Sequence, residues 1–185
     1  MQQVVLASGS PRRKQLLEWA EVHFDILVAN TDESYPDDLE ITEIPVHIAR
    51  NKAIAVQHKV NDQIVIAADT IVVLDNQVIG KPQSREHAID ILESLAGKKH
   101  RVITGVVIKR GEKEIAFADI TEVIFHPLTT AQITFYVDKY KPYDKAGAYA
   151  IQEWIGVVGI KYVSGDFYNV MGLPVNRVVQ ALQSI

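Results

Sequence analysis

Two long runs with a β pattern lie next to each other in the middle of the chain, and they restrict its fold most strongly. They cover His100 to Lys109 and Ile115 to Phe125, and Arg110-Gly111-Glu112 joins them. Runs of this kind, separated by a few residues that include glycine, predict a β-hairpin. A sheet that contains such a hairpin is not purely parallel, so a doubly wound parallel fold is disfavoured.

Shorter apolar runs and helical patterns alternate over the rest of the chain. Strands are predicted at Val4 to Ala7, Phe24 to Ala29, Ile64 to Ala68, Ile71 to Leu74, Gln77 to Ile79 and near Val157 to Tyr162. Helices are predicted at Pro11 to about Ala20, Pro45 to about Lys59, Ser84 to Ala96, Thr129 or Thr130 to about Val137, and Pro174 to Ser184. The acidic stretch from Asn30 to Glu43 is expected to be irregular. This order predicts an α/β or α+β fold with a mixed sheet and flanking helices.

The composition is that of an ordinary globular domain and excludes several classes of protein. The 185 residues are 48% hydrophobic and 23% charged, which suits one compact domain. With 19 Lys and Arg against 23 Asp and Glu, the net charge is −4, which disfavours a nucleic-acid binder but leaves room for a local basic pocket. The chain has no cysteine, so disulfides, a cysteine nucleophile and Cys-ligated zinc are excluded.

The sequence also indicates where the protein works. No apolar run approaches the ~20 residues that a membrane-spanning helix needs. The N-terminal segment lacks the basic region with which a signal peptide starts. We therefore expect a cytoplasmic protein without a membrane partner.

The hexapeptide Ser8-Gly9-Ser10-Pro11-Arg12-Arg13 joins the first predicted strand to the first predicted helix. Ser10 suits the N-cap and Pro11 the first helical position. Two arginines in the first turn oppose the helix dipole, and a bound anion would offset them. With the N–H groups of the helix start and the hydroxyls of Ser8 and Ser10, this favours a phosphate site. The alternative is a capped helix with two solvated arginines.

Four further residues could carry chemistry, and each has a structural alternative. Asp69 follows a buried-strand run, where a carboxylate can bind Mg²⁺ or activate water, or simply form a turn. Lys81, held before Pro82, and Lys52, in an apolar helix, can contact phosphate or be solvated. Gln152 ends the small-residue stretch that begins at Asp144. Its amide offers a donor and an acceptor to a base edge, whereas a buried turn explains the small residues equally well.

Together these segments resemble the Maf family of nucleoside triphosphate pyrophosphatases. The matching pieces follow the family's order over nearly the whole chain: Ser8 to Arg13, Glu33, Lys52-Ala53, Ala68-Asp69-Thr70, Gly80-Lys81-Pro82, Asp144 to Gln152, and Asn169 to Pro174. The resemblance implies one domain over residues 1–185. Its implied fold is a mixed α/β structure related to inosine triphosphate pyrophosphatases, with an active-site cleft between two lobes.

The resemblance further implies the reaction and its residues. The family hydrolyses a nucleoside triphosphate between the α- and β-phosphates, which yields the monophosphate and pyrophosphate. Asp69 is implied as the catalytic residue that orients or deprotonates the attacking water. Glu33 and Asp69 are implied as oxygen ligands of a divalent cation, Mg²⁺ or Mn²⁺. The implied phosphate-binding residues are Ser8, Ser10, Arg13, Lys52 and Lys81.

The base-selecting positions resemble those of the dTTP/UTP subgroup. They are Arg12, Thr70 and Gln152, and the last two can hydrogen-bond the O4 and N3–H edge of thymine or uracil. The chain departs from many relatives at Glu153-Trp154, where those have Gly and a small or aliphatic residue. Glu153 adds a negative charge next to the predicted base pocket.

The resulting hypothesis is a metal-dependent dTTP/UTP pyrophosphatase that removes unwanted or modified pyrimidine nucleotides, a house-cleaning role. Two alternatives stay open: a nucleotide-binding regulator of septum formation and cell division, and a pyrophosphatase for 7-methyl-GTP. The resemblance also implies a homodimer in the cytoplasm that acts on free nucleotides, not on a nucleic acid polymer.

Overall fold

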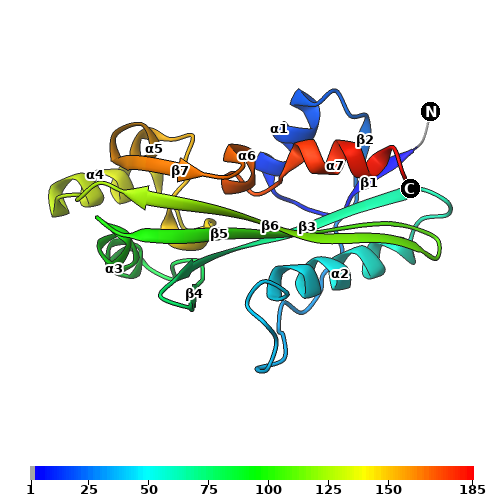
Figure 1. Cartoon of the computed structure of the whole chain (residues 1–185), viewed down its shortest axis with the longest axis horizontal. Helices are drawn as coiled ribbons and strands as arrows, with labels where there is room; N and C mark the ends of the chain where they lie inside the picture. The colour runs from blue at the N-terminus through cyan, green and yellow to red at the C-terminus, as the bar shows by residue number, and fades with distance from the viewer. Residues whose placement is uncertain (1–2) are drawn as a thin grey trace. The chain divides into compact units, whose positions relative to one another are not determined.

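A computed structural model of the chain describes residues 3–185, which form two compact units (Figure 1). The first unit consists of the described part of Met1–Thr70 together with Thr104–Asp119 and Gly172–Ile185. The second consists of Ile71–Ile103 and Ile120–Met171. Three long strands contribute residues to both units: β3 (Ile64–Leu74), β5 (Lys99–Arg110) and β6 (Lys113–Phe125).

The strands of the described chain form one mixed sheet in the order β2-β1-β3-β5-β6-β7, with β4 beside β3. β1 (Val4–Leu6) runs parallel to β2 (Phe24–Ile26) and to β3. β4 (Gln77–Ile79) is antiparallel to β3, and β7 (Ile160–Ser164) is antiparallel to β6. The mixed sheet confirms the predicted fold class. The turn of the predicted short hairpin has positive φ at both Asp75 and Asn76, as a tight hairpin turn requires.

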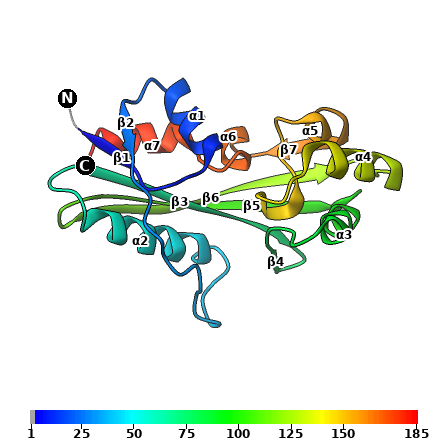
Figure 2. The same cartoon turned by 180° about the vertical axis from the view of Figure 1, so that it is seen from behind.

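In the first unit, helices cover both faces of the strands (Figures 1 and 2). α1 (Pro11–Trp19) and α7 (Val175–Leu182) lie on one side, and α2 (Ile44–Gln57) lies on the other. One apolar face of α2 packs on the inward side chains of β1, β3 and β5, because residues three and four apart share a helix face. The buried residues of this cluster are Val5, Ala7, Val46, Ala49, Ala53, Val56, Val65, Ala67 and Val107.

Gly105 in β5 permits the close approach of α2. A Cβ at this position would lie 2.2 Å from the Val46 nitrogen and 2.3 Å from the Pro45 carbonyl carbon, and neither backbone atom can rotate away. We expect Gly105→Ala to lower the free energy of unfolding by about 1–3 kcal/mol, as overpacking does. Denaturant unfolding measures this. Gly80→Ala is the matched control, because a Cβ there meets nothing within 4 Å; equal stability of the two variants would contradict the packing argument.

The second unit contains α3 (Arg85–Leu95), α4 (Thr130–Tyr140), the 3₁₀ turn η1 (Ala146–Ala148), α5 (Trp154–Gly159) and α6 (Phe167–Val170). α3 packs against α4 and η1. The expected caps are confirmed: Ser84 Oγ accepts from the His87 N–H, and Thr129 forms a capping box with Gln132. These side chains satisfy N–H groups that have no partner within their own helix.

Three local predictions were wrong. β3 does not end at Ala68 but continues through Asp69 and Thr70 to Leu74, with β5 as its neighbour in the sheet. Residues Val157 to Gly159 belong to α5 and not to the predicted strand, which is Ile160–Ser164. Their β-branched side chains favour a strand locally, but the N–H groups of Gly156 and Val157 bond the Glu153 carbonyl and form a helical turn. The second predicted strand is shorter than expected and ends at Ile26.

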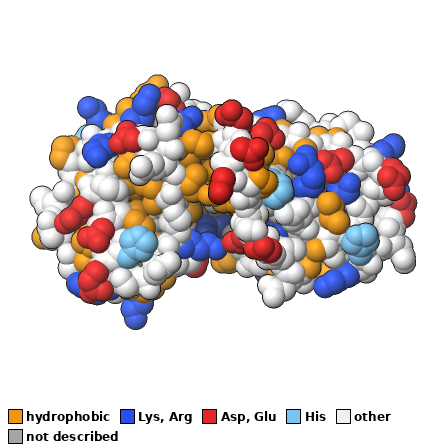
Figure 3. Space-filling model, turned by 90° about the horizontal axis from the view of Figure 1, so that it is seen from below, with side chains coloured by type: hydrophobic (Ala, Val, Ile, Leu, Met, Phe, Trp, Pro, Cys, Tyr) orange, Lys and Arg blue, Asp and Glu red, His pale blue; other side chains and the backbone are white. Residues whose placement is uncertain are grey.

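The surface matches the modest net charge. Figure 3 shows acidic and basic side chains interspersed on one face of the molecule. Within residues 3–185, no helix is both long and apolar enough to cross a membrane.

Candidate functional site

The N-terminus of α1 is built as the hexapeptide predicts. The Ser10 hydroxyl accepts from the Arg13 N–H at 3.5 Å, and Pro11 begins the helix. Ser8, two residues after the end of β1, is buried, and its hydroxyl accepts from the Ser10 N–H at 3.3 Å. The two serines therefore hold the turn in place and present the start of α1 at the carboxyl end of a parallel strand, where sites of α/β proteins form.

Arg13 is buried and not solvated. Its guanidinium donates to the Gly172 carbonyl at 2.8 Å, to Ser8 Oγ at 3.0 Å and to Thr70 Oγ1 at 3.0 Å. These partners are neutral oxygens, and burial lowers the pKa of Arg13 while the charge of Asp69 opposes this. A buried cation that is held by neutral oxygens favours a bound anion nearby.

Lys52 joins two carboxylates that the sequence places far apart. Its Nζ lies 2.8 Å from Asp69 Oδ1 and 2.8 Å from Glu33 Oε1. Lys52 and Asp69 are largely buried, with side chains 16% and 15% exposed, whereas Glu33 is 54% exposed. The Lys52–Asp69 pair forms because α2 packs on β3, so that the Lys52 side chain extends from the helix to the strand.

Asp69 and Thr70 lie inside β3 and still reach the predicted edge of the sheet. β1 pairs with β3 only as far as Leu6 opposite Ile66, and the pairing of β3 with β4 starts at Val72, opposite Ile79. The residues between these two partners thus lie just beyond the carboxyl end of β1. The sequence predicted that Asp69 lies at this edge of the sheet. The predicted reason, a strand that ends at Ala68, was wrong, because β3 continues to Leu74.

Thr70 carries its hydroxyl into a polar network within the first unit. Besides the bond from Arg13, its Oγ1 lies 2.9 Å from Thr104 Oγ1 and 3.4 Å from the Gly172 carbonyl. The sequence reading gave Thr104 and Gly172 no role. The sequence feature that could have indicated Thr104 is a polar residue within a mostly apolar strand run; the side chain is fully buried in the structure.

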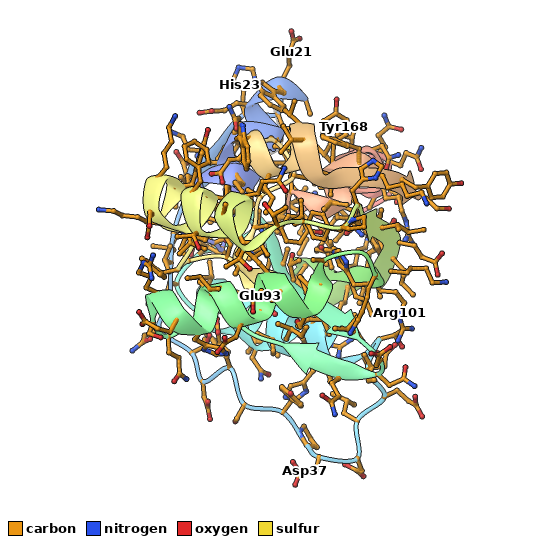
Figure 4. All side chains as sticks on the ribbon, turned by 90° about the vertical axis from the view of Figure 1, so that its left-hand side faces the viewer. Glu21, His23, Asp37, Glu93, Arg101 and Tyr168 are labelled. Carbon is orange, nitrogen blue, oxygen red and sulfur yellow. The ribbon has the colours of Figure 1, made fainter. Side chains whose placement is uncertain are left out.

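The acidic loop contributes Glu33 to this cluster, while other members face solvent. Asp32 binds Ser34 within the loop, and Asp37 lies at its far end (Figure 4). Among residues 3–185, no group of three or more His, Cys, Asp or Glu side chains could hold a metal ion by itself.

Lys81 and Gln152 belong to the second unit, and both are exposed. Their segments are linked there, because the Gly147 N–H donates to the Gly80 carbonyl at 3.2 Å. Gly147 has a φ of +71°, and a Cβ on it would lie 2.9 Å from Val72 Cγ2. The small residues of the predicted stretch therefore allow it to pack against β3 beside the Lys81 segment.

The first unit thus brings together seven of the predicted residues: Ser8, Ser10, Arg13, Glu33, Lys52, Asp69 and Thr70. Arg12 lies in the same helical turn as Arg13 and is half-buried. The cluster combines two carboxylates, two cations and a helix N-terminus, which suits a phosphorylated substrate.

Comparisons with known proteins agree with this chemistry. A family model described as "Maf-like protein" matches residues 3–185. A protein of Cytophaga hutchinsonii named dTTP/UTP pyrophosphatase is 53% identical over 182 residues, which are 98% of this chain and 84% of that protein. A protein of Parabacteroides distasonis with the same name is 47% identical over 182 residues, 97% of this chain and 94% of that protein.

The fold is also similar to that of a solved structure. A HAM1 protein from Coxiella burnetii superposes with a TM-score of 0.54 at 13% identity, and the match covers 100% of both chains. At this identity the likeness concerns the fold alone.

Proposed function

Since this chain belongs to the Maf-like protein family, we propose that it hydrolyses nucleoside triphosphates between the α- and β-phosphates, with dTTP and UTP as substrates. The names of relatives at 53% and 47% identity support the choice of substrates. The observation that carries the reaction is the Lys52–Asp69 pair at 2.8 Å beside the buried charge of Arg13. A protein that only binds triphosphate needs the cations but has no use for the carboxylate among them.

The proposed phosphate contacts come from three kinds of donor. The N–H groups at the start of α1 and the hydroxyls of Ser8 and Ser10 favour an anion there. Arg13 and Lys52 supply positive charge within the first unit, and Lys81 of the second unit is proposed as a further contact. Lys52 can exchange one of its two carboxylates for a phosphate oxygen, since an ammonium has three rotatable donors.

The residues present fit a divalent cation, Mg²⁺ or Mn²⁺. Asp69 and Glu33 both direct a carboxylate oxygen at one positive group, the Lys52 ammonium. Mg²⁺ in nucleotide enzymes is commonly held by one or two carboxylates together with phosphates and water, so two carboxylates suffice for such a site. When bound, the cation would neutralise charge on the phosphates.

Asp69 is proposed as the catalytic residue. Its free carboxylate oxygen orients a water molecule and accepts its proton as the water oxygen attacks phosphorus and the bridging P–O bond breaks. Lys52 holds the other oxygen at 2.8 Å and so keeps the carboxylate in one orientation. Positioning of this kind contributes much of the rate of phosphoryl transfer.

Arg12, Thr70 and Gln152 are proposed to select the base. A side-chain amide pairs with an acceptor and a donor on one edge of thymine or uracil. The proposal also includes the cytoplasm as the compartment, a homodimer as the assembly and free nucleotides as the partners, all of which the family resemblance supports.

A panel of triphosphates tests the proposed function. Pyrophosphate release would be measured for dTTP, UTP, 7-methyl-GTP and ATP at one concentration, with Mg²⁺ or Mn²⁺. We expect dTTP and UTP to be cleaved fastest, with the monophosphate as the second product. Preferred cleavage of 7-methyl-GTP, or release of orthophosphate only, would contradict the proposal.

Gln152→Ala should flatten the selectivity of the enzyme. Loss of paired contacts to a base edge costs about 1–3 kcal/mol, or roughly tenfold to a hundredfold in kcat/KM. The loss should appear with dTTP and UTP but be small with ATP, and the melting temperature should change little because Gln152 is exposed. A uniform loss for all three substrates with a lower melting temperature would show that Gln152 only supports a turn.

A further inference from the structure

Gln152 occupies a tight turn, here called the Gln152 turn, which runs from Ala150 to Glu153. The Glu153 N–H donates to the Ala150 carbonyl at 3.1 Å, so Ile151 and Gln152 are the two central residues. Ile151 is buried and points its side chain into the unit, whereas Gln152 is exposed. The turn therefore exposes the polar side chain of Gln152 while the apolar side chain of Ile151 anchors it in the unit.

One buried side chain holds both ends of this turn. The Tyr136 hydroxyl of α4 accepts from the Ala150 N–H at 3.1 Å and donates to the Glu153 carboxylate. Tyr136 is fully buried, and its pKa is raised, first by burial and then by the bond to Glu153, so the hydroxyl keeps its proton. Because the first and last residues of the turn meet at one atom, the turn cannot open without breaking a buried contact.

The Glu153 carboxylate is bound within this clamp, because one of its oxygens accepts from the Tyr136 hydroxyl. Its other oxygen, Oε1, lies 3.7 Å from the Lys145 ammonium, which also contacts Asp144 at 2.8 Å. Lys145 thus lies between the carboxylates of Asp144 and Glu153 and offsets part of their negative charge.

Two further contacts fix the segment around the turn. A Cβ on Gly156 would lie 1.7 Å from the Ile151 carbonyl oxygen, so the backbone of α5 rests directly on the turn. Tyr149, which precedes the turn, is bonded through its hydroxyl to His100 Nε2 at 2.7 Å. Burial lowers the pKa of His100 to about 4, so this partner stays neutral near pH 7.

We propose that Tyr136 and Glu153 are positioning residues that hold the Gln152 amide in the orientation in which it selects the base. The inference rests on the proposed function. A side chain on a preorganised turn loses less conformational freedom on binding than one on a mobile loop. The clamp acts on the turn and not on the phosphates, so it affects discrimination between bases more than turnover of a poor substrate.

Two substitutions test the clamp, each with a matched partner. Tyr136→Phe removes the hydroxyl and keeps the ring; Tyr140→Phe, in the same helix and stacked on Tyr136 with ring centroids 5.0 Å apart, is its control. Glu153→Ala removes the acceptor, whereas Glu153→Gln keeps an oxygen that can accept from Tyr136 and should retain most of the effect. Glu153→Ala decides the matter should Tyr136→Phe fail to fold.

Two measurements are made on each variant. Amide hydrogen exchange at Ala150 and Glu153 reports whether the turn is held, and it does not depend on activity. The ratio of kcat/KM for dTTP to that for ATP reports base selection. We expect faster exchange and an about tenfold lower ratio in Tyr136→Phe and Glu153→Ala, with Tyr140→Phe and Glu153→Gln close to the wild type.

Three results would overturn the inference. Unchanged exchange would show that the clamp does not hold the turn. Faster exchange with an unchanged ratio, or an equal loss for dTTP and ATP, would show that holding the turn does not serve base selection. A wild-type protein that releases no pyrophosphate from dTTP or UTP would reject the proposed function and this role together, and the exchange rates would still show whether the clamp exists.

Discussion

Replacing Asp69 by asparagine is expected to reduce kcat for dTTP and UTP by about 10²–10⁴-fold, the usual cost of losing one acid–base group. Asparagine has nearly the same shape but neither accepts a proton nor balances the charge of Lys52, which lies 2.8 Å away. Steady-state pyrophosphate release measures the loss, and thermal unfolding shows whether the fold survives.

A matched control for this variant is Asp62→Asn. Asp62 is an exposed aspartate that pairs with Arg110 at 2.7 Å, so the same chemical change occurs at a surface ion pair that shares no residue with the cluster. We expect its kcat to stay near that of the wild type. An Asp69→Asn enzyme that retains more than half of the wild-type kcat would remove Asp69 from the mechanism.

Arg13→Ala is expected to damage both stability and activity. The substitution removes three hydrogen bonds that a buried guanidinium donates, to Ser8 Oγ, Thr70 Oγ1 and the Gly172 carbonyl, and hydrogen bonds to charged groups contribute about 1.5–3 kcal/mol each. We therefore expect the free energy of unfolding to fall by about 3 kcal/mol or more. The kcat/KM values for dTTP and UTP should fall by similar factors, because both substrates present the same phosphates.

Lys81→Ala separates the loss of activity from the loss of stability that are both expected for Arg13→Ala. Lys81 is exposed, so its loss should lower kcat/KM for both substrates without a measurable change in unfolding. Arg13→Lys should not restore stability, because one ammonium cannot supply donors in the three directions that a guanidinium reaches. An Arg13→Ala protein as stable as Lys81→Ala would contradict the role of Arg13 as an internal link, and a severalfold change in the dTTP/UTP ratio would contradict its assignment to the phosphates.

Several features follow from the sequence because the forces that produce them act over a few residues. Ser10 caps α1 through an N–H three residues away, and Thr129 and Gln132 form a capping box over the same distance. The Asp75-Asn76 turn joins two strands that pair directly on either side of it, with Leu74 opposite Gln77. Patterns that extend over only a few residues can be recognised in the sequence, and they are sufficient to predict the mixed sheet and most helices.

Local sequence patterns predicted the wrong conformation for two segments whose structure depends on their packing. The sequence pattern predicted a strand end at Asp69 and Thr70, yet β3 continues through them, with β5, which starts at Lys99, beside it in the sheet. Val157 and Val158 read as strand, yet the close packing of Gly156 on Ile151 makes the segment helical. A short segment with weak local preference takes the conformation that its tertiary contacts require.

The sequence by itself determined which residue types are available for chemistry: the serines and arginines of the hexapeptide at the start of α1, the carboxylate in β3 and the amide at position 152. Only the tertiary structure decided how they are used. Arg13 is an internal link because Gly172, 159 positions away, returns to it, and Lys52 meets Asp69 because α2 packs on β3. Tyr136 holds the Gln152 turn because α4 lies against it. Burial and hydrogen bonding of this kind depend on strand register and helix packing, which bring distant residues into contact and which no local pattern encodes.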